Sequence, residues 1–214
     1  MQNTDIFKDR IDAGIQLAKR LRHFKKEDVV VLAIPRGGLP LGVIVAKELN
    51  APLDVVLSKK IGHPYNREYA IGAVNLENRI LTNAIGVTKS YIEEETTAIR
   101  KKLKERHQQY HKNRPEYSLS GKTAIIIDDG MATGNTILAT VPLLLQQKAK
   151  QIIVAVPVAS LSAIRTLEKV PEVKKIVCIK TPRDFKSVGQ FYTNFPQVTD
   201  QEAIQYLEEM NKKE

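Results

Sequence analysis

Five short runs of apolar, mostly β-branched residues recur along the chain. They cover residues 29–34 (VVVLAI), 53–58 (LDVVLS), 123–129 (TAIIIDD), 151–158 (QIIVAVPV) and 175–180 (KIVCIK). In these runs apolar residues follow one another directly instead of alternating with polar ones, which is typical of strands covered on both faces. The pattern therefore predicts five strands of a buried sheet.

Segments with apolar residues at helical spacing separate most of these strands. They predict helices over residues 39–49, 136–148 and 160–169, with two further helices at 5–24 and 199–210 on either side of the sheet region. An alternation of strands and helices favours an α/β fold in which a mostly parallel central sheet is flanked by helices.

Residues 61–121 interrupt this alternation. Two weak strands, at 70–75 (AIGAVN) and 79–82 (RILT), precede a long helix over 90–111, whose apolar stripe consists of Ile92, Ile99, Leu103 and Tyr110. We expect one domain over residues 1–214. Within it, residues 61–121 form an insertion of a loop, a strand pair and a long helix, and residues 181–214 belong to a small hood built from the terminal segments.

The composition is that of an ordinary soluble globular protein, with 43% apolar and 27% charged residues. No apolar stretch is long enough for a membrane span, and the polar N-terminus resembles neither a signal peptide nor a transit peptide. Cys178 is the only cysteine, so no internal disulfide can form, and we interpret it as a buried core thiol. We expect a cytoplasmic protein.

The formal net charge of +9 favours anionic partners, which include nucleic acid, membrane surfaces and phosphorylated metabolites. Much of this charge lies in residues 100–114, in the later half of the predicted long helix. A solvated helix face explains it better than a nucleic-acid patch. Charge alone does not choose among the partners.

Residues 125–136 (IIIDDGMATGNT) carry the clearest chemistry. The three isoleucines place Asp128 and Asp129 at the carboxyl end of a strand, the edge at which open parallel sheets bind ligands. The small residues that follow lead into a helix start, where backbone N–H groups and the helix dipole attract anions. Such a loop fits a monophosphate.

The two carboxylates would repel a phosphate, so they face something else. The vicinal hydroxyls of a sugar fit, because a carboxylate accepts hydrogen bonds, and a hydrated Mg²⁺ is the other option. The combination suggests a ribose 5-phosphate. The plain alternative is that Asp128 and Asp129 only cap a helix or close a turn.

The same residues resemble the phosphoribosyl pyrophosphate (PRPP) signature of type I phosphoribosyltransferases. Two hydrophobic residues, two acids and the later Thr-Gly-x-Thr match it over residues 125–137. The resemblance implies that Asp128 and Asp129 hold the ribose 2- and 3-hydroxyls and Mg²⁺. It further implies that the 5-phosphate is wrapped by Ala132, Thr133, Gly134, Asn135 and Thr136, and that a variable hood caps the parallel sheet.

A second loop, Arg36-Gly37-Gly38, follows the first predicted strand and precedes helix 39–49. Glycines let the backbone approach an anion, and an arginine adds a bidentate charge. In the family this position is the pyrophosphate loop, which often contains a cis peptide bond before a residue other than proline, and we expect one near Arg36. A plain strand–helix turn is the alternative.

Lys59 and Lys60 are predicted to end the second strand at the same edge of the sheet. The family has a basic pair here that reaches the pyrophosphate, and we assign that role to Lys60. Residues 62–69 resemble the family's flexible loop, which closes over the reactants, with His63 and Arg67 as candidate residues. Either side chain could equally face solvent without a role.

Residues 181–198 hold three of the five phenylalanines of the chain, Phe185, Phe191 and Phe195, together with Tyr192. In the family the hood contacts the acceptor base here, and aromatic rings can stack on a base. We therefore name Phe191 and Tyr192 as acceptor-binding candidates. A small satellite core or a dimer contact explains the rings equally well.

Across its length the chain also resembles a group of bacterial phosphoribosyltransferase-domain proteins. The shared elements are Arg-Gly-Gly, Ala-Ile-Gly-Ala-Val and Phe-x-x-Val-Gly-x-x-Tyr.

These resemblances imply a Mg²⁺-dependent phosphoribosyltransferase of nucleotide metabolism. It would transfer the 5-phosphoribosyl group of PRPP to a nitrogenous, nucleobase-like acceptor and release pyrophosphate, with Asp128, Asp129, Lys60 and Arg36 as catalytic residues. We expect a homodimer that binds neither nucleic acid nor a membrane. The rival hypothesis is a non-catalytic, PRPP-sensing regulator that binds nucleic acid.

Overall fold

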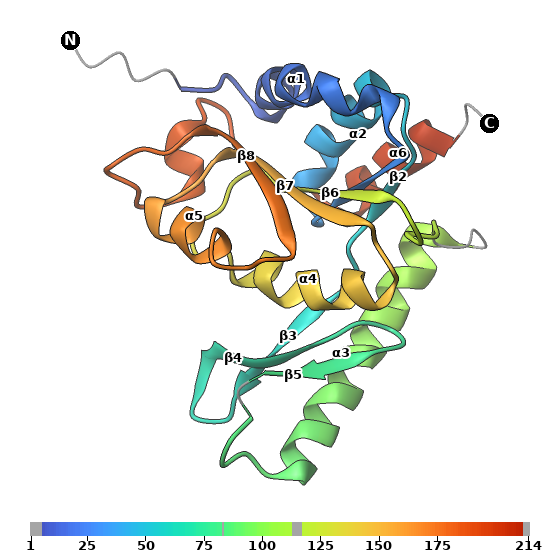
Figure 1. Cartoon of the computed structure of the whole chain (residues 1–214), viewed down its shortest axis with the longest axis vertical. Coiled ribbons are helices and arrows are strands. Elements are labelled where there is room, and N and C mark those ends of the chain that lie inside the picture. The colour runs from blue at the N-terminus through green and yellow to red at the C-terminus, as the bar shows by residue number, and fades with distance from the viewer. Residues whose placement is uncertain (1–5, 83, 113–116, 212–214) are drawn as a thin grey trace.

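A five-stranded parallel sheet forms the centre of the computed structural model, which describes residues 6–82, 84–112 and 117–211 (Figure 1). Its strands lie in the order β2-β1-β6-β7-β8 and comprise β1 (Val29–Ala33), β2 (Leu53–Val55), β6 (Thr123–Ile127), β7 (Gln151–Val158) and β8 (Val173–Lys180). Ala33 lies opposite Ile127. The loops that follow β1 and β6 therefore start side by side.

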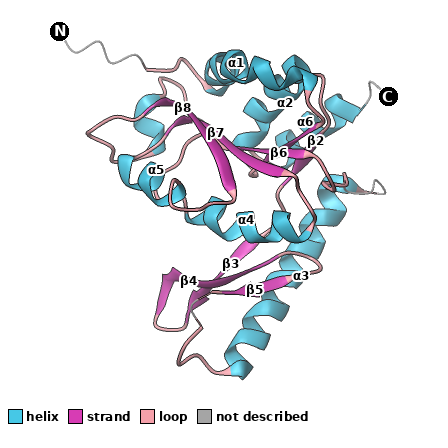
Figure 2. Cartoon of the chain, in the orientation of Figure 1, coloured by secondary structure: helices cyan, strands magenta, loops and turns pink. Residues whose placement is uncertain are grey.

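Helices cover both faces of this sheet (Figure 2). One face packs against α1 (Arg10–Leu21), α2 (Gly38–Leu49) and α6 (Asp200–Asn211), and the other against α4 (Asn135–Gln146) and α5 (Leu161–Leu167). Val31 and Ile125 point into the first apolar layer, while Leu32 and Ile126 point into the second. Because the central strands bury both faces, their sequences are apolar without alternation. The α/β prediction is confirmed.

A second, antiparallel sheet lies beyond α4 (Figure 1). It consists of β3 (Lys59–His63), β4 (Asn66–Val74) and β5 (Arg79–Leu81), and the long helix α3 (Lys89–His111) packs against it. The predicted apolar stripe of that helix is buried at all four positions. No helix among the described residues is both long and apolar enough to cross a membrane.

Three details of the predicted elements are wrong. The second strand ends at Val55, and Lys59 and Lys60 instead begin β3, because the backbone of this segment pairs with β4 and no longer with β1. The N-terminal helix starts only at Arg10, where Asp9 caps it, and continues into the 3₁₀ helix η1 (Arg22–Lys26). Strand β8 is an edge strand and is largely half-exposed, so Cys178 is partly exposed.

The start of the described chain pairs with residues 191–193 beside the sheet. Phe7 N donates to Phe191 O at 2.9 Å, and Thr193 N donates to Phe7 O at 2.8 Å. The C-terminal partner in this contact includes the short 3₁₀ helix η2 (Val188–Phe191). Phe7 itself is fully buried. We call this paired unit, Phe7 with residues 188–198, the hood; its expected role of covering a bound ligand stays a prediction.

Candidate active site

The loops after β1 and β6 are in direct contact. Ile34 N donates to Ile127 O at 2.8 Å, which continues the pairing of the two strands past their ends. A methyl group on Gly38 would lie 2.5 Å from Ile127 O, and one on Gly37 would lie 2.1 Å from Asp129 Oδ2. Only glycine allows this approach. The Pro35–Arg36 peptide bond is cis, as expected for this loop.

Asp128 and Asp129 are largely withdrawn from solvent at the end of β6. Asp128 Oδ1 accepts a hydrogen bond from Asp129 N at 2.8 Å. Burial, and then the negative charge of Asp129, raise the pKa of Asp128 well above its usual value. Burial also raises the pKa of Asp129, although the charge of Arg10 acts in the opposite direction. The pair is therefore short of positive charge, and a cation or hydroxyl donors would favour its ionised form.

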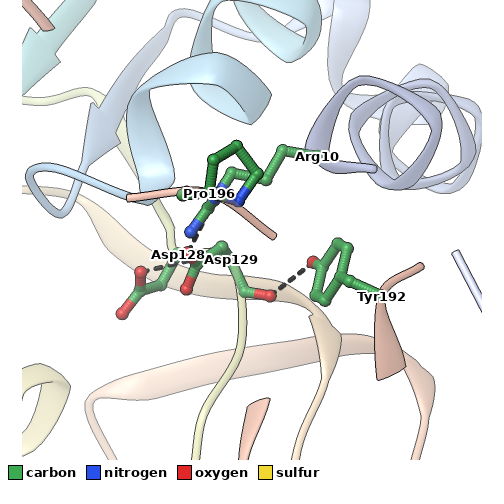
Figure 3. Close-up of polar contacts among 5 residues, drawn as sticks. All are labelled: Arg10, Asp128, Asp129, Tyr192 and Pro196. Atoms are coloured by element: carbon green, nitrogen blue, oxygen red, sulfur yellow. Dashed lines mark hydrogen bonds and ion pairs between the residues drawn. The ribbon is translucent and has the colours of Figure 1, made fainter. Parts of the chain in front are cut away.

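Arg10 is a site residue that the motifs did not reveal. Its Nε donates to Asp129 Oδ2 at 2.8 Å and its Nη1 donates to Pro196 O at 2.6 Å (Figure 3). Its guanidinium carbon lies 3.8 Å from the centre of the Phe195 ring. The sequence does contain a signal. Arg10 lies on the same helical stripe as Ala13, Gly14, Leu17, Ala18 and Leu21, all of which are buried. A charged residue on a core-facing stripe requires a partner.

The loop between Asp129 and α4 is tied to the end of β7. Met131 N donates to Val158 O at 2.9 Å, Ser160 N donates to Met131 O at 2.9 Å, and Ser160 Oγ donates to Ala132 O at 2.6 Å. Gly134, with φ of 74°, begins α4 without a side-chain cap. Thr133 and Thr136 are exposed there. The first N–H group of α4, that of Asn135, donates to Thr133 Oγ1 at 3.4 Å. A helix start of this kind attracts an anion.

A pocket of about 400 Å³ lies between the Arg36–Gly38 loop and the hood. Arg36 lines it, with Nη1 3.6 Å from Asp200 Oδ2 at the start of α6. The complete lining is Arg10, Arg36, Gly37, Asp129, Val188, Phe195, Gln197 and Val198. Other pockets among the described residues, of about 470, 480 and 440 Å³, are lined by neither aspartate.

The two predicted acceptor-binding rings differ in their burial and in their neighbours. Tyr192 is 6% exposed, with its ring 5.4 Å from that of Phe7 and stacked at 4.8 Å on that of Phe195. A ring covered in this way favours the small-core interpretation over base stacking. Phe191 is only partly buried and packs against Phe185 at 5.3 Å. Its role in acceptor binding stays a prediction.

The structure places Lys60, and His63 and Arg67 of the predicted flexible loop, in the second sheet. Lys60 lies opposite Ala73 in the β3–β4 hairpin. At the tip of that hairpin His63 lies beside Tyr65 and Tyr69, and on β4 Arg67 forms a 2.7 Å ion pair with Glu95 of α3. These side chains therefore belong to a separate layer from the two ligand loops, and any role for Lys60 at the site requires the hairpin to reach it.

The fold and the two loops define an α/β protein with an acidic, glycine-lined site at the carboxyl edge of a parallel sheet. A family model for the phosphoribosyl transferase domain matches residues 4–195, and the chain belongs to this family. Two curated proteins of Mycobacterium tuberculosis, provisionally named phosphoribosyl transferases, are each 35% identical to it over 212 residues. The match covers 97% of this chain but 47% of theirs, so the chain spans about half the length of these relatives.

Solved structures agree with this assignment. A crystal structure of a Thermus thermophilus protein superimposes with a TM-score of 0.89 at 36% identity, covering 96% of this chain and 99% of that one. A Neisseria gonorrhoeae protein crystallised with ppGpp shares only the fold, with a TM-score of 0.50 at 17% identity over 95% of this chain and 89% of its own. The type I phosphoribosyltransferase fold that the motifs predicted is confirmed.

Proposed function

We propose that this domain transfers the 5-phosphoribosyl group of PRPP to a nitrogenous, nucleobase-like acceptor and releases pyrophosphate. Membership of the phosphoribosyl transferase family supports the transferase class. The observation that carries the choice of donor is the contact between Gly37 and Asp129. It brings a glycine-lined anion loop and a pair of sugar-binding acids to one point of the sheet edge.

The donor would lie along the loop that follows β6. Asp128 and Asp129 accept hydrogen bonds from the ribose 2- and 3-hydroxyls, which relieves the charge repulsion within the buried pair. The 5-phosphate occupies the uncapped start of α4, within residues 132–136, where Ser160 holds the backbone at Ala132. Anchoring at both ends fixes the ribose while its C1 bond breaks.

The two aspartates also fit a magnesium ion. The described residues contain no group of three or more His, Cys, Asp or Glu side chains that could form a complete metal cage. Mg²⁺ is usually held by one or two carboxylates together with substrate oxygens and water, so Asp128 and Asp129 would hold it in the company of PRPP. When bound, Mg²⁺ supplies positive charge that stabilises the departing pyrophosphate.

The leaving group would be received by Arg36 and the backbone at Gly37 and Gly38. A fixed guanidinium and backbone N–H groups stabilise negative charge as it develops on the pyrophosphate. Lys60 would join them when the β3–β4 hairpin closes, and His63 and Arg67 would accompany it. Closure would exclude water, which otherwise hydrolyses PRPP.

The acceptor would enter the 400 Å³ pocket between the Arg36–Gly38 loop and the hood. A pocket of this size accommodates a nucleobase-sized molecule, and Phe191 remains the candidate for base stacking. A homodimer in the cytoplasm remains part of the proposal.

A pyrophosphate-release assay tests the proposal. The protein is incubated with PRPP, MgCl₂ and a panel of purine, pyrimidine and amine acceptors, and pyrophosphate is measured. The Asp128→Asn, Asp129→Asn double variant should neither bind PRPP nor release pyrophosphate. Asp28→Asn, which changes a largely exposed aspartate paired with Lys122, should behave as wild type.

Two results would count against the proposal. Absence of PRPP binding by the wild-type protein would remove the donor assignment. Tight PRPP binding without pyrophosphate release from any acceptor, together with salt-sensitive DNA binding, would instead establish the PRPP-sensing regulator.

A further inference from the structure

We propose that Arg10 and Tyr192 form a clamp that positions Asp129 for the ribose diol. The inference rests on the proposed function, because it concerns the sugar that Asp129 would bind. It assigns both residues a positioning role, since they act through Asp129 and not on the reacting atoms. Figure 3 shows the two side chains approaching Asp129 from different directions.

Arg10 holds the side chain of Asp129. Its Nε donates to Oδ2 at 2.8 Å, while Gly37 closes off the adjacent space so tightly that a methyl group there would lie 2.1 Å from the same oxygen. The bond from Arg10 engages Oδ2, so a ligand hydroxyl would be accepted through Oδ1. The carboxylate is therefore restrained at Oδ2.

The guanidinium of Arg10 is itself fixed by the hood. Nη1 donates to Pro196 O at 2.6 Å, the cation stacks on Phe195 at 3.8 Å, and the whole residue is only 9% exposed. Three anchors on one planar group leave it little rotational freedom. The restraint on Asp129 comes from the protein's own contacts, which is the condition for preorganised binding.

Tyr192 holds the main chain of the same residue. Its hydroxyl donates to Asp129 O at 2.6 Å, while Phe7 and Phe195 pack against its ring. Phe195 contacts both Arg10 and Tyr192, so the two contacts to Asp129 share one support in the hood. The hood therefore fixes Asp129 at its side chain and at its backbone.

The test separates recognition of the diol from recognition of the phosphate. Ribose 5-phosphate would use both Asp129 and the 132–136 loop, whereas inorganic phosphate would contact only the loop. Affinities for both are measured by calorimetry or NMR titration for wild type, Arg10→Gln, Arg10→Lys and Tyr192→Phe. The matched control is Arg22→Gln, which removes another 2.8 Å contact from an arginine Nε to a carboxylate, the exposed pair with Glu48.

Arg10→Gln should weaken ribose 5-phosphate binding about 10- to 100-fold, the range expected when a charge-assisted hydrogen bond is lost. Inorganic phosphate should bind as in wild type. Arg10→Lys should recover part of the lost affinity for ribose 5-phosphate, because it restores the charge but not the three-point anchoring. Tyr192→Phe should weaken ribose 5-phosphate binding severalfold while the packing of its ring stays intact. A purely structural role would change the affinities for both ligands in parallel.

Several outcomes overturn the clamp. If Arg10→Gln and Tyr192→Phe bind ribose 5-phosphate as tightly as wild type, Asp129 needs no positioning, and tighter binding would show that Arg10 competes with the sugar. If Arg10→Gln does not fold, Arg10→Lys and Tyr192→Phe provide the test. For each of them the change in affinity for ribose 5-phosphate is compared with the change in affinity for inorganic phosphate. If the wild-type protein binds neither ribose 5-phosphate nor PRPP, the proposed function fails and the clamp fails with it, a result distinct from a failure confined to the variants.

Discussion

Gly37→Ala tests whether the two ligand loops depend on their close contact. The added methyl group would lie 2.1 Å from Asp129 Oδ2 and 2.6 Å from Asp129 Cγ, whereas ordinary contacts begin at 3.4 Å. Either the carboxylate or the loop must therefore move by about 1.3 Å. That is close to half the 2.8 Å distance from Asp129 Oδ2 to Arg10 Nε, so the geometry of the acid cannot survive unchanged.

We expect Gly37→Ala to weaken PRPP binding at least about tenfold, because a displacement of about 1 Å at a catalytic position already has large effects on rate. Overpacking should lower the free energy of unfolding by about 1–3 kcal/mol without abolishing the fold. Calorimetric titration with PRPP and MgCl₂ measures the first effect, and urea unfolding measures the second.

Gly42→Ala is the matched control, within the helix that follows Gly37. Its methyl group would lie 3.0 Å from Leu53 Cδ1 and 3.1 Å from Ala33 Cβ, so it crowds the core but not the site. It should lose some stability and keep its affinity for PRPP. If Gly37→Ala binds PRPP within about twofold of wild type, donor binding does not need the close approach of the loops, and the requirement for a residue without a side chain at this position is refuted.

Three further changes probe other parts of the structure. Burial raises the pKa of Asp128 above its usual 3.8, so the folded state keeps this proton to higher pH than the unfolded chain does, and the free energy of unfolding falls as the pH rises through that interval. In urea unfolding at pH 8 with EDTA, Asp128→Asn should be more stable than wild type by on the order of 1 kcal/mol. Equal stability of the two proteins would contradict a cost of burying this charge. Ser160→Ala removes the hydrogen bond to Ala132 O and the cap on Ala163 N. It should lower the free energy of unfolding by about 1 kcal/mol in the same assay and weaken phosphate binding. An unchanged phosphate affinity would show that the bond to Ala132 is dispensable. Asp54→Ala leaves the buried ring of His111 without its 2.6 Å partner. The free energy of unfolding should fall by about 3 kcal/mol, measured by thermal unfolding, and a loss below about 1 kcal/mol would mean that the pair contributes little.

The two ligand loops were predictable because their chemistry is local. Each is a short run that starts where a buried strand ends, and the carboxyl ends of parallel strands share one edge of the sheet. That rule places Arg36–Gly38 and Asp128–Asp129 at one edge of the sheet. The pairing of β1 with β6, which the sequence did not specify, brings Gly37 and Asp129 into contact.

The position of Lys59 and Lys60 was not predictable in the same way. An apolar run followed by two lysines has the same local pattern whether the strand continues or a new one begins. The pairing of Lys60 with Ala73 depends on a partner strand farther along the chain, and no local pattern specifies which partner the backbone finds.

The aromatic residues of the hood show a related limit. A ring suits a stacked base and a small core equally well. Only the neighbours of Tyr192, namely Phe7 from the N-terminal segment and Phe195, favour the small core for that residue.

The sequence by itself determined the α/β class, the central strands and the position of the acidic loop that follows β6, because periodicity and short motifs are properties of neighbouring residues. Tertiary structure alone decided that Arg10 pairs with Asp129, a residue 119 positions away. It also decided that the basic hairpin belongs to a second sheet. Both depend on the packing of segments distant in sequence. A charged side chain requires a partner only where the surrounding chain has excluded water, and that surrounding is set by the tertiary structure.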